Sequence, residues 1–112
     1  MAGSLPALWI LVRMKFINLT NRSVTVQTAN GTVTYKSDGY CGFHVHRFTS
    51  SVVQGVCVDQ ERLEVAGVPD AQAGVMIIVP RDVRLALYRR FDLVTPDGLD
   101  DSGVYWRFVA NG

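Results

Sequence analysis

The sequence predicts an α+β fold, in which a mostly antiparallel sheet of about seven short strands, able to close into a barrel, carries one short helix. Three observations favour this fold. Short segments alternate between apolar and polar residues with a period of two, as half-buried strands do. Asn-Gly and Asp-Gly pairs separate several of these segments. Val, Thr and aromatic residues are plentiful, and long helical periodicity is missing.

The first clear element is a hairpin. Residues 22–28 place Val24 and Val26 on one face and polar side chains on the other. Asn30-Gly31 then supplies a turn, and residues 32–35 alternate again. Two alternating segments around Asn-Gly are the strongest short-range signal for a β-hairpin.

The middle of the chain is expected to continue as short strands. Residues 42–49 are typical of a third strand, and residues 52–58 continue in the same style with an interruption, a turn or a bulge, at Gly55. The polar residues 59–64 are expected to form a turn that leads into a short strand at residues 63–65.

The segment from Gly74 to Gly98 predicts a strand, a short helix and a second strand. Residues 75–79 are purely apolar, residues 81–90 contain good helix formers without Gly or Pro, and a turn follows at residues 96–98. The helical connection is close to the minimum for a parallel crossover, so both orientations of the flanking strands stay open. Residues 104–109 complete the sheet.

A chain of 112 residues predicts one domain, which we place at residues 15–112. Residues 1–14 are expected to be an N-terminal extension or arm. Two interpretations of residues 1–13 stay open. They are a translated upstream extension, or they form a real edge strand or a hydrophobic arm that docks on a partner; an arm ordered as a strand on another subunit would make the protein a homo-oligomer. Leu5 to Val12 is far shorter than the roughly 20 apolar residues of a membrane span and lacks the pattern of a signal peptide. We therefore expect no membrane association and a cytoplasmic location in the host cell.

Charge and cysteine content bound the function further. The net charge of +1 lacks the excess of basic residues typical of nucleic-acid-binding domains, so a nucleic-acid partner is not expected. Cys41 and Cys57, without a secretory signal, favour free thiols in a reducing compartment.

The residues around the third strand offer two chemical sites to weigh. Cys41, His44, His46 and Cys57 could form a Cys2His2 metal site, but their spacing matches no usual zinc pattern. A cysteine nucleophile would need a neighbouring base, and no nucleophile motif is present. We therefore expect no metal, no cofactor and no catalytic residue.

Two sets of binding residues are predicted. The partner-binding candidates are basic and aromatic, the composition of interface hot spots: Arg81, Arg84, Tyr88, Tyr35 and Trp106. Arg81 and Arg84 lie one turn apart on the predicted helix, although an ordinary solvated face is the alternative there. The ligand-binding candidates would line a barrel mouth: His44, His46 and Tyr40.

Several motifs carry a resemblance. Phe16-Ile17-Asn18-Leu19-Thr20, followed by Val24 and Val26, resembles an opening that reads Ile-Asn-Leu-Thr-Pro-His-Pro-Val in a family of small phage, prophage and bacterial proteins. The family's Gly-Leu-Pro loop and its later strand, helix and strand have counterparts at residues 67–69, 74–79, 83–88 and 92–97. Asn21-Arg22-Ser23 departs from the family's Pro-His-Pro, and Pro80 stands where the family commonly has Ser.

The resemblance implies an accessory protein of a phage or mobile element, and it brings no activity with it. We therefore expect a non-enzymatic protein that binds and modulates a host protein, such as an inhibitor of a host defence system. The alternative is a protein that binds or sequesters a small ligand or nucleotide. A cryptic hydrolase is the least favoured hypothesis, since it would need His44 or His46 within about 3 Å of a nucleophile.

Overall fold

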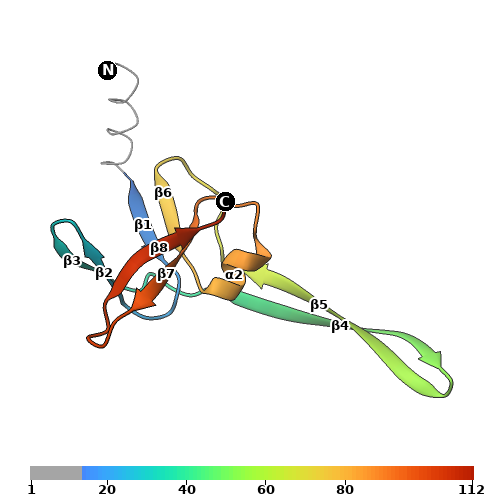
Figure 1. The fold of residues 1–112 in the computed structure, drawn as a ribbon. Helices are drawn as coiled ribbons and strands as arrows, with labels where there is room; N and C mark the ends of the chain where they lie inside the picture. The colour runs from blue at the N-terminus through green and yellow to red at the C-terminus, as the bar shows by residue number, and fades with distance from the viewer. Residues whose placement is uncertain (1–13) are drawn as a thin grey trace.

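The computed structural model describes residues 14–112, which form eight strands and one short helix (Figure 1). The expectations for residues 1–13 lie outside this range. The strands are short except for two, and their bounds are β1 (Lys15–Asn18), β2 (Val24–Thr28), β3 (Gly31–Tyr35), β4 (Gly42–Val53), β5 (Val56–Ala66), β6 (Val75–Ile78), β7 (Leu93–Leu99) and β8 (Tyr105–Ala110). The helix α2 spans Arg81–Ala86 and is shorter than the sequence predicts.

Six of these strands form a nearly closed, barrel-like sheet in the order β1-β6-β7-β8-β2-β3. A β-rich fold with one short helix and a barrel-like sheet is thus confirmed. The orientation within this sheet is mixed, because β1, β6 and β7 run parallel to one another and β2 pairs parallel with β8. The predicted hairpin of β2 and β3 is present, in the register that places Val26 opposite Val33.

Strand β6, helix α2 and strand β7 form the predicted strand–helix–strand unit, and the two strands are parallel. Ile77 and Ile78 of β6 are both fully buried, on opposite faces of the sheet. Ile77 joins a cluster with Val83 of the helix, whereas Ile78 joins a second cluster inside the barrel with Val24 and Val26. A strand covered on both faces is expected to be continuously apolar, which explains the sequence of this segment.

Asn18 closes the barrel between its two edge strands. This side chain is completely buried, and its Nδ2 donates hydrogen bonds to the carbonyl oxygens of Arg22 and Tyr35 at 2.7 and 2.9 Å. Its Oδ1 accepts from the backbone N–H and the hydroxyl of Thr20 at 3.0 and 2.6 Å. The Phe16 and Tyr35 rings pack across the same gap, with centroids 5.1 Å apart. The Asn-Leu-Thr motif therefore has a structural role here.

Strands β4 and β5 form a separate two-stranded sheet, called here the long hairpin, which projects away from the barrel (Figure 1). Its register runs from Gly42 opposite Ala66 to Val53 opposite Val56, with an irregularity between Thr49 and Ser51. Since a strand advances by about 3.3 Å per residue, the 12 residues of β4 span roughly 40 Å.

The predicted turn at residues 59–64 is wrong, because these residues pair with residues 44–49 as part of β5. The turn lies at Gln54-Gly55, where both residues have positive φ, of 50° and 79°, as a type I′ turn requires. Polar residues can occupy β5 because a ribbon that leaves the barrel has solvent on both faces.

Candidate functional site

The long hairpin is apolar at its root and again at its tip, but only the root is covered. Phe43 and Val65 pair with each other and pack against the buried cluster under α2. The next pair outward on the same face, Val45 and Leu63, is 53% and 62% exposed. The other described residues therefore cover the long hairpin only at its root.

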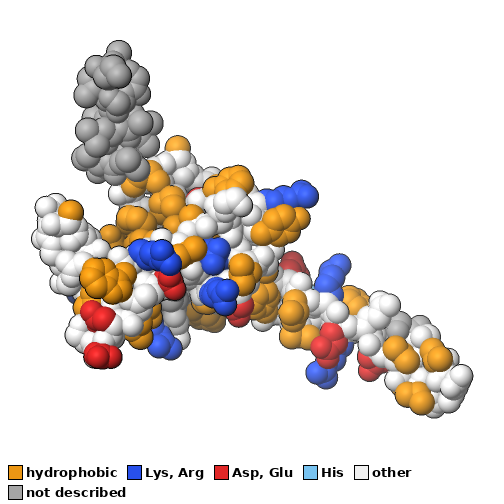
Figure 2. All heavy atoms as spheres, in the orientation of Figure 1, with side chains coloured by type: hydrophobic (Ala, Val, Ile, Leu, Met, Phe, Trp, Pro, Cys, Tyr) orange, Lys and Arg blue, Asp and Glu red, His pale blue; other side chains and the backbone are white. Residues whose placement is uncertain are grey.

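The outer end, called here the hairpin tip, consists of Val52, Val53 and Val56 around the turn. These side chains are 65%, 54% and 62% exposed, and Figure 2 shows the resulting hydrophobic surface at the far end of the molecule. Residues 50–58 carry no charge. Adjacent exposed apolar side chains of this kind are typical of surfaces that meet another molecule.

Charged side chains hold the middle of the long hairpin. Arg47 donates to Glu61 at 2.8 Å, and the His46 ring lies 2.7 Å from the Glu64 carboxylate. Both pairs are exposed, so they set the register more than they stabilise the protein. The outer main-chain edges of β4 and β5 pair with no other strand in the described part of the chain. Open edges can accept a strand from a partner.

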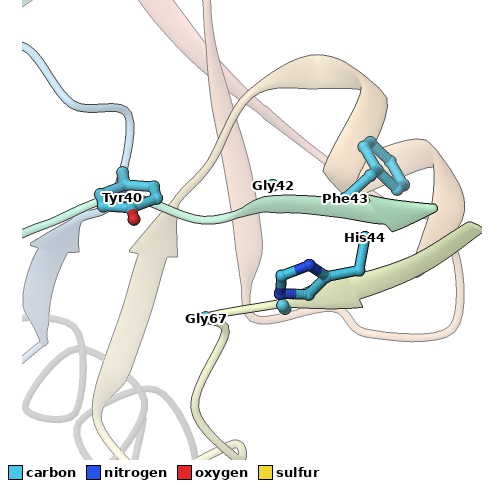
Figure 3. A pocket seen from close by; sticks show the side chains of 6 residues that line it. Tyr40, Gly42, Phe43, His44 and Gly67 are labelled. Atoms are coloured by element: carbon cyan, nitrogen blue, oxygen red, sulfur yellow. The ribbon is translucent and has the colours of Figure 1, made fainter.

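The predicted ligand-binding residues lie at the root of the long hairpin. Tyr40 and His44 line an open hollow of about 320 Å³ together with Phe43 and Gly67 (Figure 3). Figure 3 shows Tyr40 and His44 at opposite sides of the hollow, while Phe43 projects to the other face of β4. His46 does not line this hollow and pairs with Glu64 instead.

Of the predicted partner-binding residues, the structure brings Arg81 and Arg84 together. Both line a hollow of about 370 Å³ between α2, β7 and β8. Tyr88 is exposed beyond the helix, and Trp106 is exposed beside a different, small hollow. The Tyr35 ring packs against Phe16 and Phe108, so most of it serves the barrel. The hollow that Arg81 and Arg84 line does not include Tyr35, Tyr88 or Trp106 among its described residues.

Arg84 is buried, which the solvated-face alternative does not account for. Its side chain folds back from α2, donating from Nε to the Thr95 hydroxyl at 3.1 Å and from Nη1 to Asn111 Oδ1 at 3.0 Å. Arg107 of β8 reaches the same hollow and donates to Asp97 at 2.8 and 3.0 Å. The hydrogen bond from Arg107 lowers the pKa of Asp97 below its usual value, and the charge of Arg81 acts in the same direction.

The two cysteines are free thiols in different surroundings. Cys41 is buried in the cluster under α2, and burial, followed by the charge of Asp82, raises the pKa of its thiol. Cys57 pairs with Val52 near the hairpin tip and is exposed. Within residues 14–112, no three His, Cys, Asp or Glu side chains lie close enough to share a metal ion.

No protein family model matches the chain, and no curated protein or solved structure matches it. The resemblance to small phage and bacterial proteins therefore stays a prediction. Among the described residues, no helix has the length and apolar character needed to cross a membrane.

Three features escaped the sequence reasoning. The long hairpin was divided into separate strands because Gln-Gly is not a typical turn pair. Arg107 joins Arg81 and Arg84 from the far end of the chain, and no local spacing could have indicated this. Asn111, near the C-terminus, organises Arg84 and the end of α2. The available signal was Gly55, which the sequence already marks as a turn or a bulge between two strand-like segments.

Proposed function

We propose that this chain is a non-enzymatic accessory protein of phage or mobile-element origin that acts in the host cytoplasm by binding and modulating a host protein through its long hairpin. One observation carries the proposal: the hairpin tip exposes three valines at the end of an element that adds little to the core. The resemblance at residues 16–26 supports the origin. A host defence enzyme is the class of partner that this origin favours.

The exposed valines are costly to keep unless a partner covers them. Each leaves most of its apolar surface in water, and a flat exposed ribbon with open edges promotes aggregation. Val53 and Val56 pair on one face of the tip and Val52 lies on the other, so the tip can enter an apolar groove that contacts both faces. An edge of β4 or β5 that pairs with no other described strand offers main-chain hydrogen bonds to a strand of the partner. A protein partner with an apolar groove or an open sheet edge therefore suits this surface better than a small ligand does.

The test replaces Val52, Val53 and Val56 by Thr together. Thr keeps the β-branched shape and the strand preference of Val, so the exposed hairpin is expected to stay folded while the tip loses its apolar surface. Wild type should capture a host protein from bacterial lysate, and the same protein, once purified, should bind wild type at least about tenfold more tightly than the triple variant.

Val33→Thr is the matched control, since Val33 is an exposed strand valine outside the long hairpin, 39% exposed on β3. It should bind the partner as wild type does. Binding of the triple variant with wild-type affinity would contradict the proposal. A loss of affinity in Val33→Thr as large as that in the triple variant would also contradict it. Light scattering over a range of concentrations would reveal self-association. If wild type forms a dimer and the triple variant does not, the hairpin tip binds a second copy of this chain instead of a host protein.

A further inference from the structure

The hollow between α2, β7 and β8, called here the arginine hollow, carries an excess of positive charge. Arg81 and Arg84 line it from the helix side and Arg107 lines it from β8. Among the described lining residues, Asp97 is the one carboxylate. Asp97 is bound by Arg107 through two hydrogen bonds. Figure 2 shows Lys and Arg side chains gathered over this part of the molecule. Asp97 thus neutralises the charge of Arg107, whereas Arg81 and Arg84 have no carboxylate of their own among the described lining residues.

Arg84 is the unusual member of this set. It is only 8% exposed, and the two acceptors that it reaches, Thr95 and Asn111, are both uncharged. No carboxylate within residues 14–112 forms an ion pair with Arg84. Burying a guanidinium without a counter-ion is costly, because the cation loses its hydration and gains no opposite charge. An anion in the hollow would remove this cost.

The guanidinium of Arg84 keeps donors available for such an anion. A guanidinium has five N–H donors, and the structure uses Nε and Nη1 for the bonds to Thr95 and Asn111. No completely buried side-chain nitrogen in the described chain lacks a partner, so a nitrogen of Arg84 without a hydrogen bond keeps some contact with solvent, and Arg84 itself lines the hollow. Two fixed bonds orient the planar group, which lowers the entropy lost when a ligand binds.

Asn111 fixes the backbone that carries Arg84. Its Nδ2 lies 3.0 to 3.1 Å from the carbonyl oxygens of Arg84, Leu87 and Arg90, at the end of α2 and the turn after it. Its Oδ1 accepts from the Arg84 side chain. One residue therefore holds both the main chain and the guanidinium of Arg84 in place.

A second hollow of about 310 Å³ adjoins the first and shares Arg81, Thr95 and Pro96 with it. Its lining adds the apolar Val24, the aromatic Tyr105 and a further cation, Arg22. An anion held by Arg81 and Arg84 would thus have an apolar and aromatic surface next to it. The pair of hollows suits a ligand with a charged group and an organic part.

We infer that the arginine hollow binds the phosphate group of a small phosphate monoester, with Arg81 and Arg84 on the phosphate and the organic part against Tyr105. Two unmatched guanidinium groups balance the charge of nearly −2 on a phosphate monoester, whereas a carboxylate would leave one unmatched. The arginine fork also matches phosphate oxygens. The site lies outside the long hairpin, so it can succeed or fail independently of the proposed function.

The test titrates isotope-labelled wild-type protein with phenyl phosphate, inorganic phosphate and benzoate, followed by NMR. Phenyl phosphate should shift the amide signals of α2, β7 and β8 saturably and bind more tightly than inorganic phosphate, which lacks the ring. Benzoate should bind at least about tenfold more weakly than phenyl phosphate, because it carries one charge. Lowering the pH below about 6 should weaken phenyl phosphate binding, since the phosphate then gains a proton.

Variants locate the site. Arg81→Gln should weaken phenyl phosphate binding about tenfold or more, the usual effect of losing a charge-assisted hydrogen bond. Arg89→Gln is the matched control, because Arg89 is an exposed arginine after the same helix that lines neither hollow, and it should bind as wild type does. Arg84→Lys keeps the charge but loses the fork and should also weaken binding; if it unfolds, Arg81→Gln still decides.

Three results would overturn the inference: no saturable binding of either phosphate probe to wild type, unchanged affinity in Arg81→Gln, or equal affinity for benzoate and phenyl phosphate. Binding of an oligonucleotide without binding of the small probes would also overturn it, in favour of phosphodiester recognition.

Discussion

The barrel and the long hairpin contain the same kinds of apolar residue but treat them in opposite ways. In the barrel, Leu93 is completely buried between the sheet and α2, whereas Leu63 in the long hairpin is 62% exposed. The barrel also satisfies its buried polar groups internally, as Asn18 shows with its bonds to Arg22 and Tyr35. Among residues 14–112, no third strand pairs with β4 or β5.

This difference separates stability from recognition. An isolated two-stranded ribbon is marginally stable in water, and one that exposes valines gains little from them while it is alone. Apolar residues that do not stabilise the fold are best explained by a contact with another molecule. We therefore expect the barrel to supply most of the free energy of folding, and partner binding through the long hairpin stays a proposal.

The largest expected difference between the two regions is in the free energy of unfolding after a leucine in each is truncated to alanine. Leu93→Ala should lower the free energy of unfolding by about 2–5 kcal/mol, since it leaves a cavity in the core. Leu63→Ala should change the same quantity by less than about 0.5 kcal/mol, because its side chain is mostly in water. Urea unfolding of both variants measures the difference. Similar losses in the two variants would show that the long hairpin is part of the folding core.

A smaller effect is expected where the two regions join. Gly67 follows β5 with φ of +88°, and a Cβ there would lie 2.9 Å from the Tyr40 carbonyl oxygen. Gly67→Ala should therefore lower the free energy of unfolding by about 1–3 kcal/mol. Gly55 also has a positive φ, but an added Cβ there would have open space around it. Gly55→Ala should therefore lower the free energy of unfolding by less than Gly67→Ala does. Thermal unfolding compares the two variants, and a larger loss in Gly55→Ala would argue against close packing at the junction.

The smallest expected effect is a pH-dependent change in the stability of the barrel. The hydrogen bond from Arg90 lowers the pKa of Asp92 in the folded protein, and the two side chains are 23% and 15% exposed. A carboxyl group with a lowered pKa stabilises the fold above its unfolded-state value, and this contribution is lost as the pH falls through the folded-state pKa.

Asp92→Asn should therefore be less stable than wild type by about 1 kcal/mol at pH 7. The difference should shrink as the pH falls below about 4. Urea unfolding at a series of pH values measures it. A difference that stays constant from pH 7 to pH 2 would remove the ion pair as its cause.

The sequence predicted the barrel better than the long hairpin, for a physical reason. Val24 and Val26 alternate with polar residues because one face of β2 is buried, and residues 75–79 are apolar because both faces of β6 are covered. Residues 59–64 have no buried face, so their polar character resembled a turn. Hydrophobic patterning reports burial, and it is least informative where a strand leaves the core.

The candidate sites were predicted only in part for a related reason. Arg81 and Arg84 were found because they are neighbours on one helix. Arg107 and Asn111 reach the same place through the pairing of β8 with β7, which no spacing in the sequence encodes. The burial of Arg84 likewise depends on Thr95 and Asn111, which are distant in the chain.

The most direct test of the division between barrel and long hairpin is a shortened hairpin. His46 pairs with Arg62, so an Asn-Gly turn can replace residues 47–61 and join these two positions. The measurement is the binding of this variant to the host protein captured by wild type, after urea unfolding has shown that it folds. We predict an unfolding free energy within about 1 kcal/mol of wild type and no partner binding. Partner binding at wild-type affinity, or failure of the barrel to fold, would contradict the account.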